Sequence, residues 1–121
     1  MTGSEVQRKR QVILITGAAR GIGRAIADRL ASDGHHLALN DVDAKGLAHA
    51  VSQLKEAGHQ VLGLAGDVGD SGTIGEMVDK VIKQFGRIDS LVNNAGIVAF
   101  LLSDEAEFIT GQVLSLSLIH I

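Results

Sequence analysis

The sequence predicts an α/β fold, in which a doubly wound parallel sheet carries helices on both faces. Between residues 11 and 94, short apolar runs alternate with amphipathic segments at a regular pitch. The apolar runs lack the strict polar–apolar alternation of a strand that has one solvated face. Both features are typical of βαβ units, because each helix carries the chain back across the sheet to begin the next parallel strand.

Four strands and three helices are expected in this stretch. The strands are Val12–Ile15, residues 37–39, Val61–Ala65 and a run through Ile88, Leu91 and Val92. The first helix repeats Ile22, Ile26 and Leu30, the second covers residues 44–57, and the third carries the apolar stripe Ile74, Met77, Val78, Val81, Ile82 and Phe85. Ser71 or Thr73 is expected to cap the third helix, and Gly34, Gly58 and Gly86 are expected to end the three helices.

Composition excludes several classes of function. The chain has 121 residues, enough for one domain with a core, and its net charge of −3 comes without a basic run, so we expect no nucleic-acid partner. It has no cysteine, which removes disulfides and thiolate metal sites. The first apolar run is too short for a signal peptide or a membrane span, so we expect a cytoplasmic protein with no membrane partner.

No metal site is predicted from the histidines. They are His35, His36, His49, His59 and His120, and none has the spacing with an acidic residue that marks a zinc-binding helix. Because they fall at helix ends, in turns and in the tail, we expect them to be solvated.

Residues 16–23, with the sequence TGAARGIG, lie between the first strand and the first helix. Gly17 lets the chain leave the strand sharply, while Gly21 and Gly23 allow a ligand and the helix to approach closely. The first N–H groups of a helix lack acceptors and its dipole end is positive, so a diphosphate can dock there. The spacing differs from the commonest dinucleotide fingerprint, and the alternative is a loop that needs glycine only for its turn.

Asp41 lies eighteen residues after Gly23, close to the offset of roughly 20 at which an acidic side chain reaches the adenosine ribose. A carboxylate there accepts hydrogen bonds from the ribose hydroxyls and repels a 2′-phosphate, which favours NAD over NADP. The alternative is an ordinary turn aspartate. Arg20 points the other way, since a guanidinium beside the glycine turn could bind a 2′-phosphate. Asp41 carries more weight, because its position requires contact with the ribose.

Two further positions follow the third and fourth expected strands. Asp67 could accept a hydrogen bond from the adenine amino group while Val68 covers the ring, although the pair could equally be an ordinary strand end. Asn94 follows the fourth strand. Right-handed crossovers bring the carboxyl ends of parallel strands to one edge of the sheet, so all of these positions are expected to converge there.

In this order and spacing, these residues resemble the short-chain dehydrogenase/reductase family. The resemblance covers residues 11–97 and is carried by the glycine turn, Asp67-Val68, Ile88-Asp89 and the sequence LVNNAGI at residues 91–97. It implies a Rossmann-type sheet with strand order 3-2-1-4 and NAD(P) as cofactor. By resemblance, the pyrophosphate is held by Gly17, Ala18, Arg20, Gly21, Ile22 and Gly23, the adenosine ribose by Asp41, the adenine by Asp67 and Val68, and the nicotinamide-side ribose is flanked by Asn94, Ala95 and Gly96.

The sequence departs from the family after Ile97. The family's catalytic serine, Tyr-x-x-x-Lys pair and asparagine have no counterpart, because 25 residues follow Gly96 and the chain has no tyrosine. Residues 98–115 instead resemble the family's last helix and strand. We therefore interpret the chain as a dinucleotide-binding half-domain at residues 11–97 joined to this remnant, with the catalytic middle missing. Residues 116–121 fit neither part, and are either a short apolar strand end or a translated sequencing adapter.

The resemblance favours an NAD(P)-binding fragment of an alcohol/ketone oxidoreductase, with NAD preferred over NADP and no catalytic residues. One alternative is a non-enzymatic nucleotide-binding or partner-binding module, and another is an enzyme that uses His36 or Lys83 as acid and base. The sequence does not define the substrate. The exposed edge of the fourth strand is expected to promote homo-oligomers or aggregation, unless residues 112–116 dock there as a fifth strand.

Overall fold

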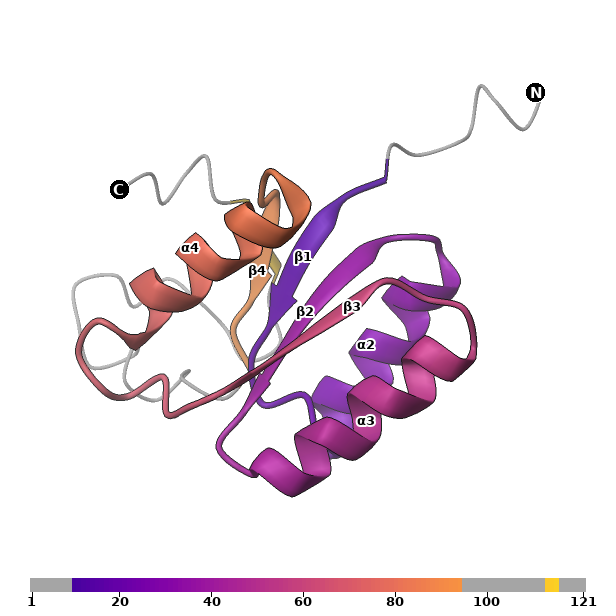
Figure 1. Cartoon of the computed structure of the whole chain (residues 1–121), viewed down its shortest axis with the longest axis horizontal. Helices are drawn as coiled ribbons and strands as arrows, with labels where there is room; N and C mark the ends of the chain where they lie inside the picture. Colours follow the sequence, from indigo (N-terminus) through magenta and orange to yellow (C-terminus); the bar gives the residue numbers. More distant parts are fainter. Residues whose placement is uncertain (1–9, 95–112, 116–121) are drawn as a thin grey trace.

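The computed structural model describes residues 10–94 and 113–115 (Figure 1). The elements follow in the order β1 (Val12–Ile15), α2 (Gly21–Ser32), β2 (His36–Asp41), α3 (Ala44–Glu56), β3 (Val61–Ala65), α4 (Thr73–Phe85), β4 (Ser90–Val92) and β5 (Val113–Ser115). Strands and helices alternate through residues 10–94, which confirms the α/β fold class.

The sheet has the order β3-β2-β1-β4-β5. The first four strands are parallel, with Val12 opposite His36 and Leu14 opposite Leu91, so the predicted order 3-2-1-4 is confirmed. β5 pairs antiparallel with β4 and places Val113 opposite Val92. Val113–Ser115 thus forms a fifth strand at the edge of β4, which is the alternative that the sequence left open.

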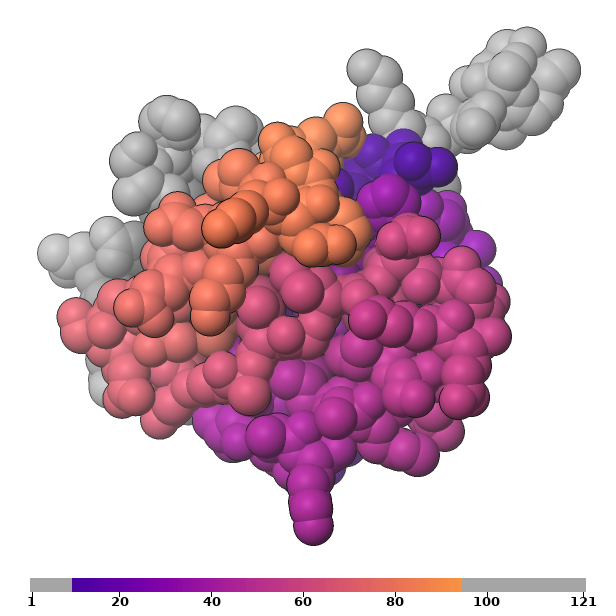
Figure 2. Space-filling view, viewed as in Figure 1, coloured from indigo at the N-terminus to yellow at the C-terminus, as the bar shows by residue number. Residues whose placement is uncertain are grey.

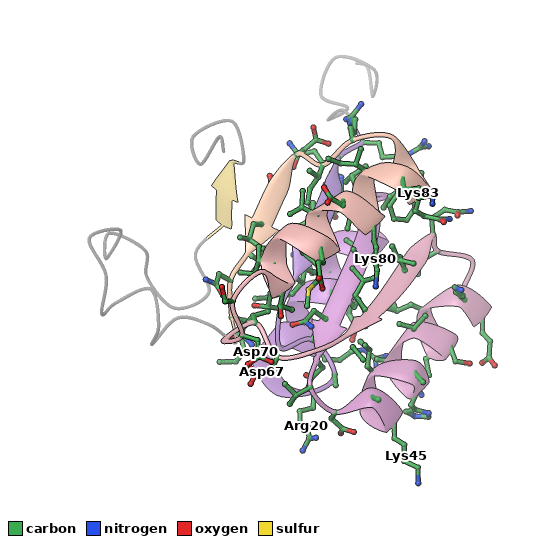
Figure 3. The ribbon with its side chains drawn as sticks, turned by 60° about the vertical axis from the view of Figure 1, so that its left-hand side comes forward. Arg20, Lys45, Asp67, Asp70, Lys80 and Lys83 are labelled. Carbon is green, nitrogen blue, oxygen red and sulfur yellow. The ribbon has the colours of Figure 1, made fainter. Side chains whose placement is uncertain are left out.

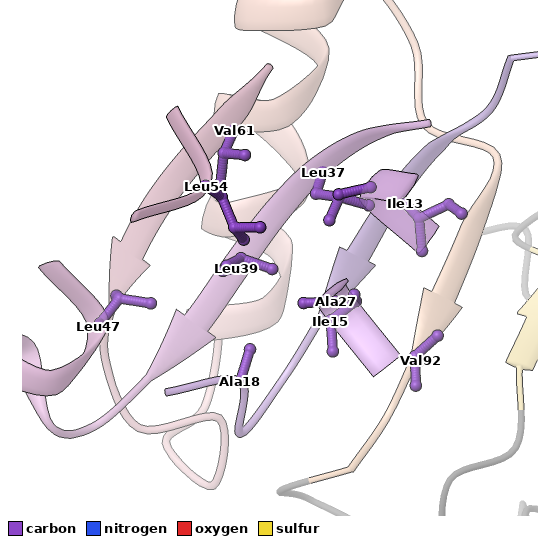
Figure 4. Packing of buried hydrophobic residues seen from close by; sticks show 11 residues of the cluster. Ile13, Ile15, Ala18, Ala27, Leu37, Leu39, Leu47, Leu54, Val61 and Val92 are labelled. Carbon is purple, nitrogen blue, oxygen red and sulfur yellow. The ribbon is translucent and has the colours of Figure 1, made fainter. Parts of the chain in front are cut away.

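β1 is buried along its whole length because helices cover both of its faces. Ile13 and Ile15 pack into the cluster formed with α2 and α3, whereas Val12 and Leu14 pack into the cluster formed with α4. Figure 4 shows the first cluster, and Figure 1 shows α2 and α3 on one side of the sheet and α4 on the other. This two-sided packing explains why the strand sequence VILI is uniformly apolar.

Several local expectations are wrong. Neither Ser71 nor Thr73 caps α4, since its N-cap is Gly72, a glycine in the left-handed conformation that makes no side-chain cap. Ile82 lies outside the core at 43% exposure, whereas Met77 and Val81 are the buried residues of α4. β2 extends through Asp41, which pairs with Ala65 of β3. Asp41 is therefore the last residue of the strand, whereas the sequence places it after the strand.

The expectation of solvated histidines is also wrong for two of them. His35 is buried, and its Nδ1 accepts the N–H of Gln11 at 3.0 Å. His36 is half-buried at the start of β2, with its ring centroid 5.2 Å from that of Phe85. Both histidines lie at the amino end of the sheet, because His36 begins β2 and pairs with Val12, the first residue of β1.

The pKa of His36 lies below its ordinary value of 6.5, first because burial disfavours the imidazolium and then because Arg10 and Arg87 are positive. The unfolded chain therefore takes up this proton more readily than the folded one. We expect the free energy of unfolding to be highest above pH 6.5 and to fall as the pH drops towards the lowered pKa. His36→Phe, which keeps a ring beside Phe85, should flatten that fall in urea titrations made above pH 6.5 and one unit below it. His49→Phe, at an exposed site on α3, is the control, and an equal flattening there would contradict the assignment.

Candidate functional site

The segments that follow β1, β2, β3 and β4 are tied together at the carboxyl edge of the sheet. The Thr16 N–H donates to the Val92 carbonyl at 3.0 Å, and the Ala18 N–H donates to the Asn40 carbonyl at 2.9 Å. The Gly66 N–H donates to the Asp41 carbonyl at 3.1 Å. The carboxyl edge is therefore a connected backbone framework on which the side chains discussed below are placed.

The glycine turn brings the chain from β1 into α2. Gly17 and Gly21 have φ angles of 64° and 62°, which side-chain-bearing residues rarely adopt. Arg20 is the N-cap of α2 and makes no side-chain cap, so the first N–H groups of this helix have no acceptor within it. A Cβ on Gly21 would meet no atom within 4 Å, so the turn is open on that side. An anion fits this arrangement, because N–H donors and the positive helix end face an uncrowded approach.

Gly23 has a different role, which is to let α2 pack against the turn. A Cβ there would lie 2.0 Å from the carbonyl oxygen of Gly17 and 3.0 Å from Nδ2 of Asn94. The distance to the Gly17 carbonyl oxygen, a backbone atom, is too short for real atoms, so only glycine fits at this position. Ile22 lies between the two helical glycines and is exposed at 65%.

Asn94 fastens the end of β4 to the glycine turn. Its N–H donates to Oγ1 of Thr16 at 2.9 Å, and its Nδ2 donates to the Gly17 carbonyl at 3.2 Å. The Thr16 hydroxyl in turn donates to Oδ1 of Asn93 at 3.2 Å. No role is predicted from the sequence for Thr16 or Asn93, which the structure shows to be buried. Polar residues directly after two apolar runs are a signal that could have identified them.

Asp41 faces the glycine turn. Its Oδ2 accepts the N–H of Ala19 at 2.9 Å, and its Oδ1 accepts the N–H of Asp43 at 3.0 Å. Each carboxylate oxygen has a second lone pair, so Asp41 can accept further bonds while its orientation stays fixed. The structure thus holds Asp41 against the glycine turn at Ala19.

Asn40 is a second residue that the sequence analysis passed over. It is 1% exposed, and its Nδ2 donates to the carbonyls of Leu64 and Gly66, each at 2.9 Å. These two bonds fix the path of the backbone as it leaves β3, and so they help to set the position of Asp67. Its polarity directly after the apolar run at residues 37–39 is the signal that could have identified it.

Asp67 and Val68 lie at the same edge, just after β3, which β2 separates from β1. Oδ1 of Asp67 accepts the N–H of Gly69 at 2.8 Å, which closes a tight turn, and Val68 packs against the cluster below α4. Figure 3 shows Asp67 and Arg20 at the same end of the molecule. Ala95 and Gly96, the last two predicted site residues, lie outside the described residues.

Arg20 forms an ion pair that the sequence analysis did not foresee. Its Nη2 lies 2.5 Å from Oδ2 of Asp43, which also caps α3 by accepting the N–H of Gly46 at 3.0 Å. The Gly46 N–H and then the Arg20 guanidinium hold the pKa of the Asp43 carboxyl below its ordinary value. Asp43 is therefore ionised at neutral pH.

Two further expectations concern residues away from this edge. His36 and Lys83, considered as an alternative acid and base, do not reach it, since His36 begins β2 at the opposite end and Lys83 lies on the last turn of α4 (Figure 3). Within residues 10–94 and 113–115, no three His, Asp or Glu side chains are grouped so as to hold a metal ion. In the same part of the chain, no helix has both the length and the apolar character needed to cross a bilayer.

Residues 11–116 match the family model described as short chain dehydrogenase. This match covers most of the chain, and it agrees with a parallel sheet in which a glycine turn, an acidic residue at the end of β2 and an asparagine after β4 converge. The chain belongs to the short-chain dehydrogenase family.

Individual relatives agree with this assignment. The chain is 44% identical over 87 residues to the (2S)-[(R)-hydroxy(phenyl)methyl]succinyl-CoA dehydrogenase subunit BbsD of Thauera aromatica, and this match covers 72% of the chain and 35% of the relative. A short-chain dehydrogenase/reductase of Burkholderia phymatum, solved with NAD, shares 37% identity at a TM-score of 0.66 over 69% of the chain and 30% of that protein. The L-sorbose reductase of Gluconobacter frateurii, solved with NADPH and L-sorbose, shares 40% identity at a TM-score of 0.69 over 73% of the chain and 34% of that protein. The chain spans about a third of the length of the relatives it matches.

Proposed function

We propose that this chain binds a nicotinamide dinucleotide at the carboxyl edge of its sheet, with NAD preferred over NADP. The observation that carries the proposal is the joining of the glycine turn to Asp41 through the Ala19 N–H. This bond holds an anion-binding helix end and a ribose-binding carboxylate in one fixed arrangement. Two solved relatives support the class of ligand, one holding NAD and the other NADPH.

Each predicted site residue has a role in this proposal. The backbone at the start of α2 holds the pyrophosphate, because N–H donors and the helix dipole favour negative charge there. The residues of this group are Gly17, Ala18, Arg20, Gly21, Ile22 and Gly23. Asp41 accepts bonds from the ribose hydroxyls. Farther along the edge, Asp67 and Val68 take the adenine, and Asn94 with Ala95 and Gly96 borders the nicotinamide-side ribose.

Replacing Asp41 tests the preference for NAD. In the unaltered chain NADH should bind more tightly than NADPH, because a carboxylate at the ribose attracts hydroxyls and repels a 2′-phosphate. Asp41→Ala should narrow that difference by about 1.5–3 kcal/mol, the usual range for a charged hydrogen bond. Calorimetric titration of both dinucleotides provides the measurement, with Asp79→Ala on the exposed face of α4 as the control. Equal affinities in the unaltered chain would show that Asp41 does not contact the ribose.

We further propose that the chain binds the dinucleotide without catalysing alcohol oxidation or ketone reduction. Bound nicotinamide supplies or accepts the hydride, but the alkoxide left on a reduced carbonyl must be protonated as it forms. A positioned general acid contributes roughly 10²–10⁴-fold to such a step, and the family's acid is a tyrosine, a residue type absent from this sequence. A panel of secondary alcohols with NAD should give no turnover above the reaction without protein. Turnover that depends on Asp41 would contradict this proposal while leaving cofactor binding intact.

A further inference from the structure

Asp43 lies beside Asp41 at the corner where the glycine turn meets α3. A Cβ on Gly46, in the first turn of α3, would lie 3.4 Å from Cβ of Ala19, so the two segments are in direct contact. Asp43 joins them, because one of its oxygens pairs with Arg20 and the other caps the helix at Gly46. This contact connects residues that are 23 positions apart in the chain.

The side chain of Arg20 is accessible but engaged. Its side chain is 76% exposed, whereas that of Asp43 is 36% exposed, so a ligand can reach the guanidinium from solvent. Its Nη2 nevertheless points at the Asp43 carboxylate, and Asp43 is ionised at neutral pH because the Gly46 N–H and Arg20 lower its pKa. Asp43 therefore occupies Nη2, and an anion that binds the other N–H groups of Arg20 remains near the negative charge of Asp43.

The Asp41 carboxylate accepts hydrogen bonds from both of the segments that carry Arg20 and Asp43. One of its oxygens accepts the N–H of Ala19, the neighbour of Arg20, and the other accepts the N–H of Asp43 itself. A phosphate on the 2′-hydroxyl of a ribose held by Asp41 would therefore meet both carboxylates. Lys45, on the exposed side of α3, lies at the same end of the molecule (Figure 3), and its backbone N–H is a further donor to the Asp43 carboxylate.

We propose that Asp43 is a positioning residue for cofactor choice: it holds Arg20 in an ion pair and so withholds the guanidinium from the 2′-phosphate of NADP. This inference rests on the proposed function, since it assumes that a dinucleotide binds with its adenosine ribose at Asp41. Asp41 favours the ribose hydroxyls of NAD directly, and Asp43 removes the one cation of the glycine turn that could compensate for NADP.

The test is a pair of substitutions that remove the negative charge of residue 43 but keep a side chain that can cap α3. Asn and Ser both accept a hydrogen bond at an N-cap, so Asp43→Asn and Asp43→Ser should leave α3 folded. Each should tighten NADPH binding by about tenfold, because Arg20 is released and a repelling charge is removed, while NADH binding changes by less than about twofold. The chain has no tryptophan or tyrosine, so the titration follows the fluorescence of the reduced dinucleotide itself.

The matched control is Asp33→Asn. Asp33 also forms an exposed ion pair with an arginine, Arg29, but at the other end of α2, and its loss should leave both affinities unchanged. In an Arg20→Ala background, Asp43→Asn should improve NADPH binding by clearly less than in the unaltered background, since the repelling charge is removed but there is no guanidinium to release.

Three results would overturn the inference. A tenfold gain in both backgrounds would show that the charge of Asp43 acts directly and that Arg20 plays no part. Unchanged NADPH binding in Asp43→Asn and Asp43→Ser, with NADH bound normally, would overturn the inference and leave the proposed function standing. Failure of the unaltered folded chain to bind either dinucleotide would overturn both.

Discussion

Gly23→Ala is expected to destabilise the chain by about 3 kcal/mol and to abolish dinucleotide binding. The added methyl group would lie 2.0 Å from the carbonyl oxygen of Gly17 and 2.8 Å from its carbon. Both atoms belong to the backbone, so no rotamer change can relieve the overlap. Either α2 moves away from the turn or the turn unfolds, and in both cases the Asn94 bond to Gly17 is lost.

The control for Gly23→Ala is Gly75→Ala, because Gly75 is a helical glycine with no atom within 4 Å of its added Cβ. Gly75→Ala should stabilise α4 by about 0.5–1 kcal/mol, since alanine loses less backbone entropy in a helix. Urea unfolding followed by far-ultraviolet circular dichroism measures both changes. A cost below about 1 kcal/mol for Gly23→Ala would show that α2 does not pack as closely against the turn as described.

Asn40→Leu is expected to cost about 2–4 kcal/mol, the second-largest effect. Leucine has the same branched skeleton of heavy atoms as asparagine but is larger and cannot donate, so the carbonyls of Leu64 and Gly66 lose the Nδ2 group that they share. A buried acceptor left without its donor costs about 1–3 kcal/mol, and two are affected here. Urea unfolding at neutral pH measures the loss, and Gln53→Leu, on the exposed face of α3, is the control.

Asn40→Asp gives an independent test of the same two bonds. At neutral pH the aspartate would direct a buried negative charge at two carbonyl oxygens, whereas a protonated carboxyl could donate to one of them. The folded state would then bind a proton more tightly than the unfolded state, so the variant's deficit relative to the unaltered chain should shrink at about pH 4. A deficit that is the same at both pH values would mean that residue 40 does not face these carbonyls.

The sequence predicts those parts of the site that depend on local spacing. Gly17, Gly21 and Gly23 are recognisable because a strand, a turn and a helix adjoin within a few residues. Asp41 is recognisable because one crossover helix sets its distance from the turn. The strand order follows from the same reasoning, since right-handed crossovers leave few ways to connect four parallel strands.

The missed features depend on contacts between distant segments. The ion pair of Arg20 with Asp43 spans 23 residues, and nothing in either local sequence distinguishes it from two solvated charges. His35 resembles a turn residue because it follows Gly34, yet the start of β1 covers it and supplies the N–H of Gln11. Ser71 and Thr73 are good capping residues on either side of Gly72, yet the φ of 85° at this glycine determines the turn, so neither of them caps α4.

The position of β1 in the sheet has a consequence for how the chain folds. β1 gains one neighbour early, from β2, but its other neighbour is β4, and the bond from the Val12 N–H to Asp89 closes a loop of 77 residues. Contacts of such long range form slowly, because the chain between them loses entropy before the pairing is made. During synthesis, the β4-facing side of this apolar strand therefore stays open until residues 90–92 emerge. An assembling chain is then most vulnerable to intermolecular strand pairing just before β4 is complete.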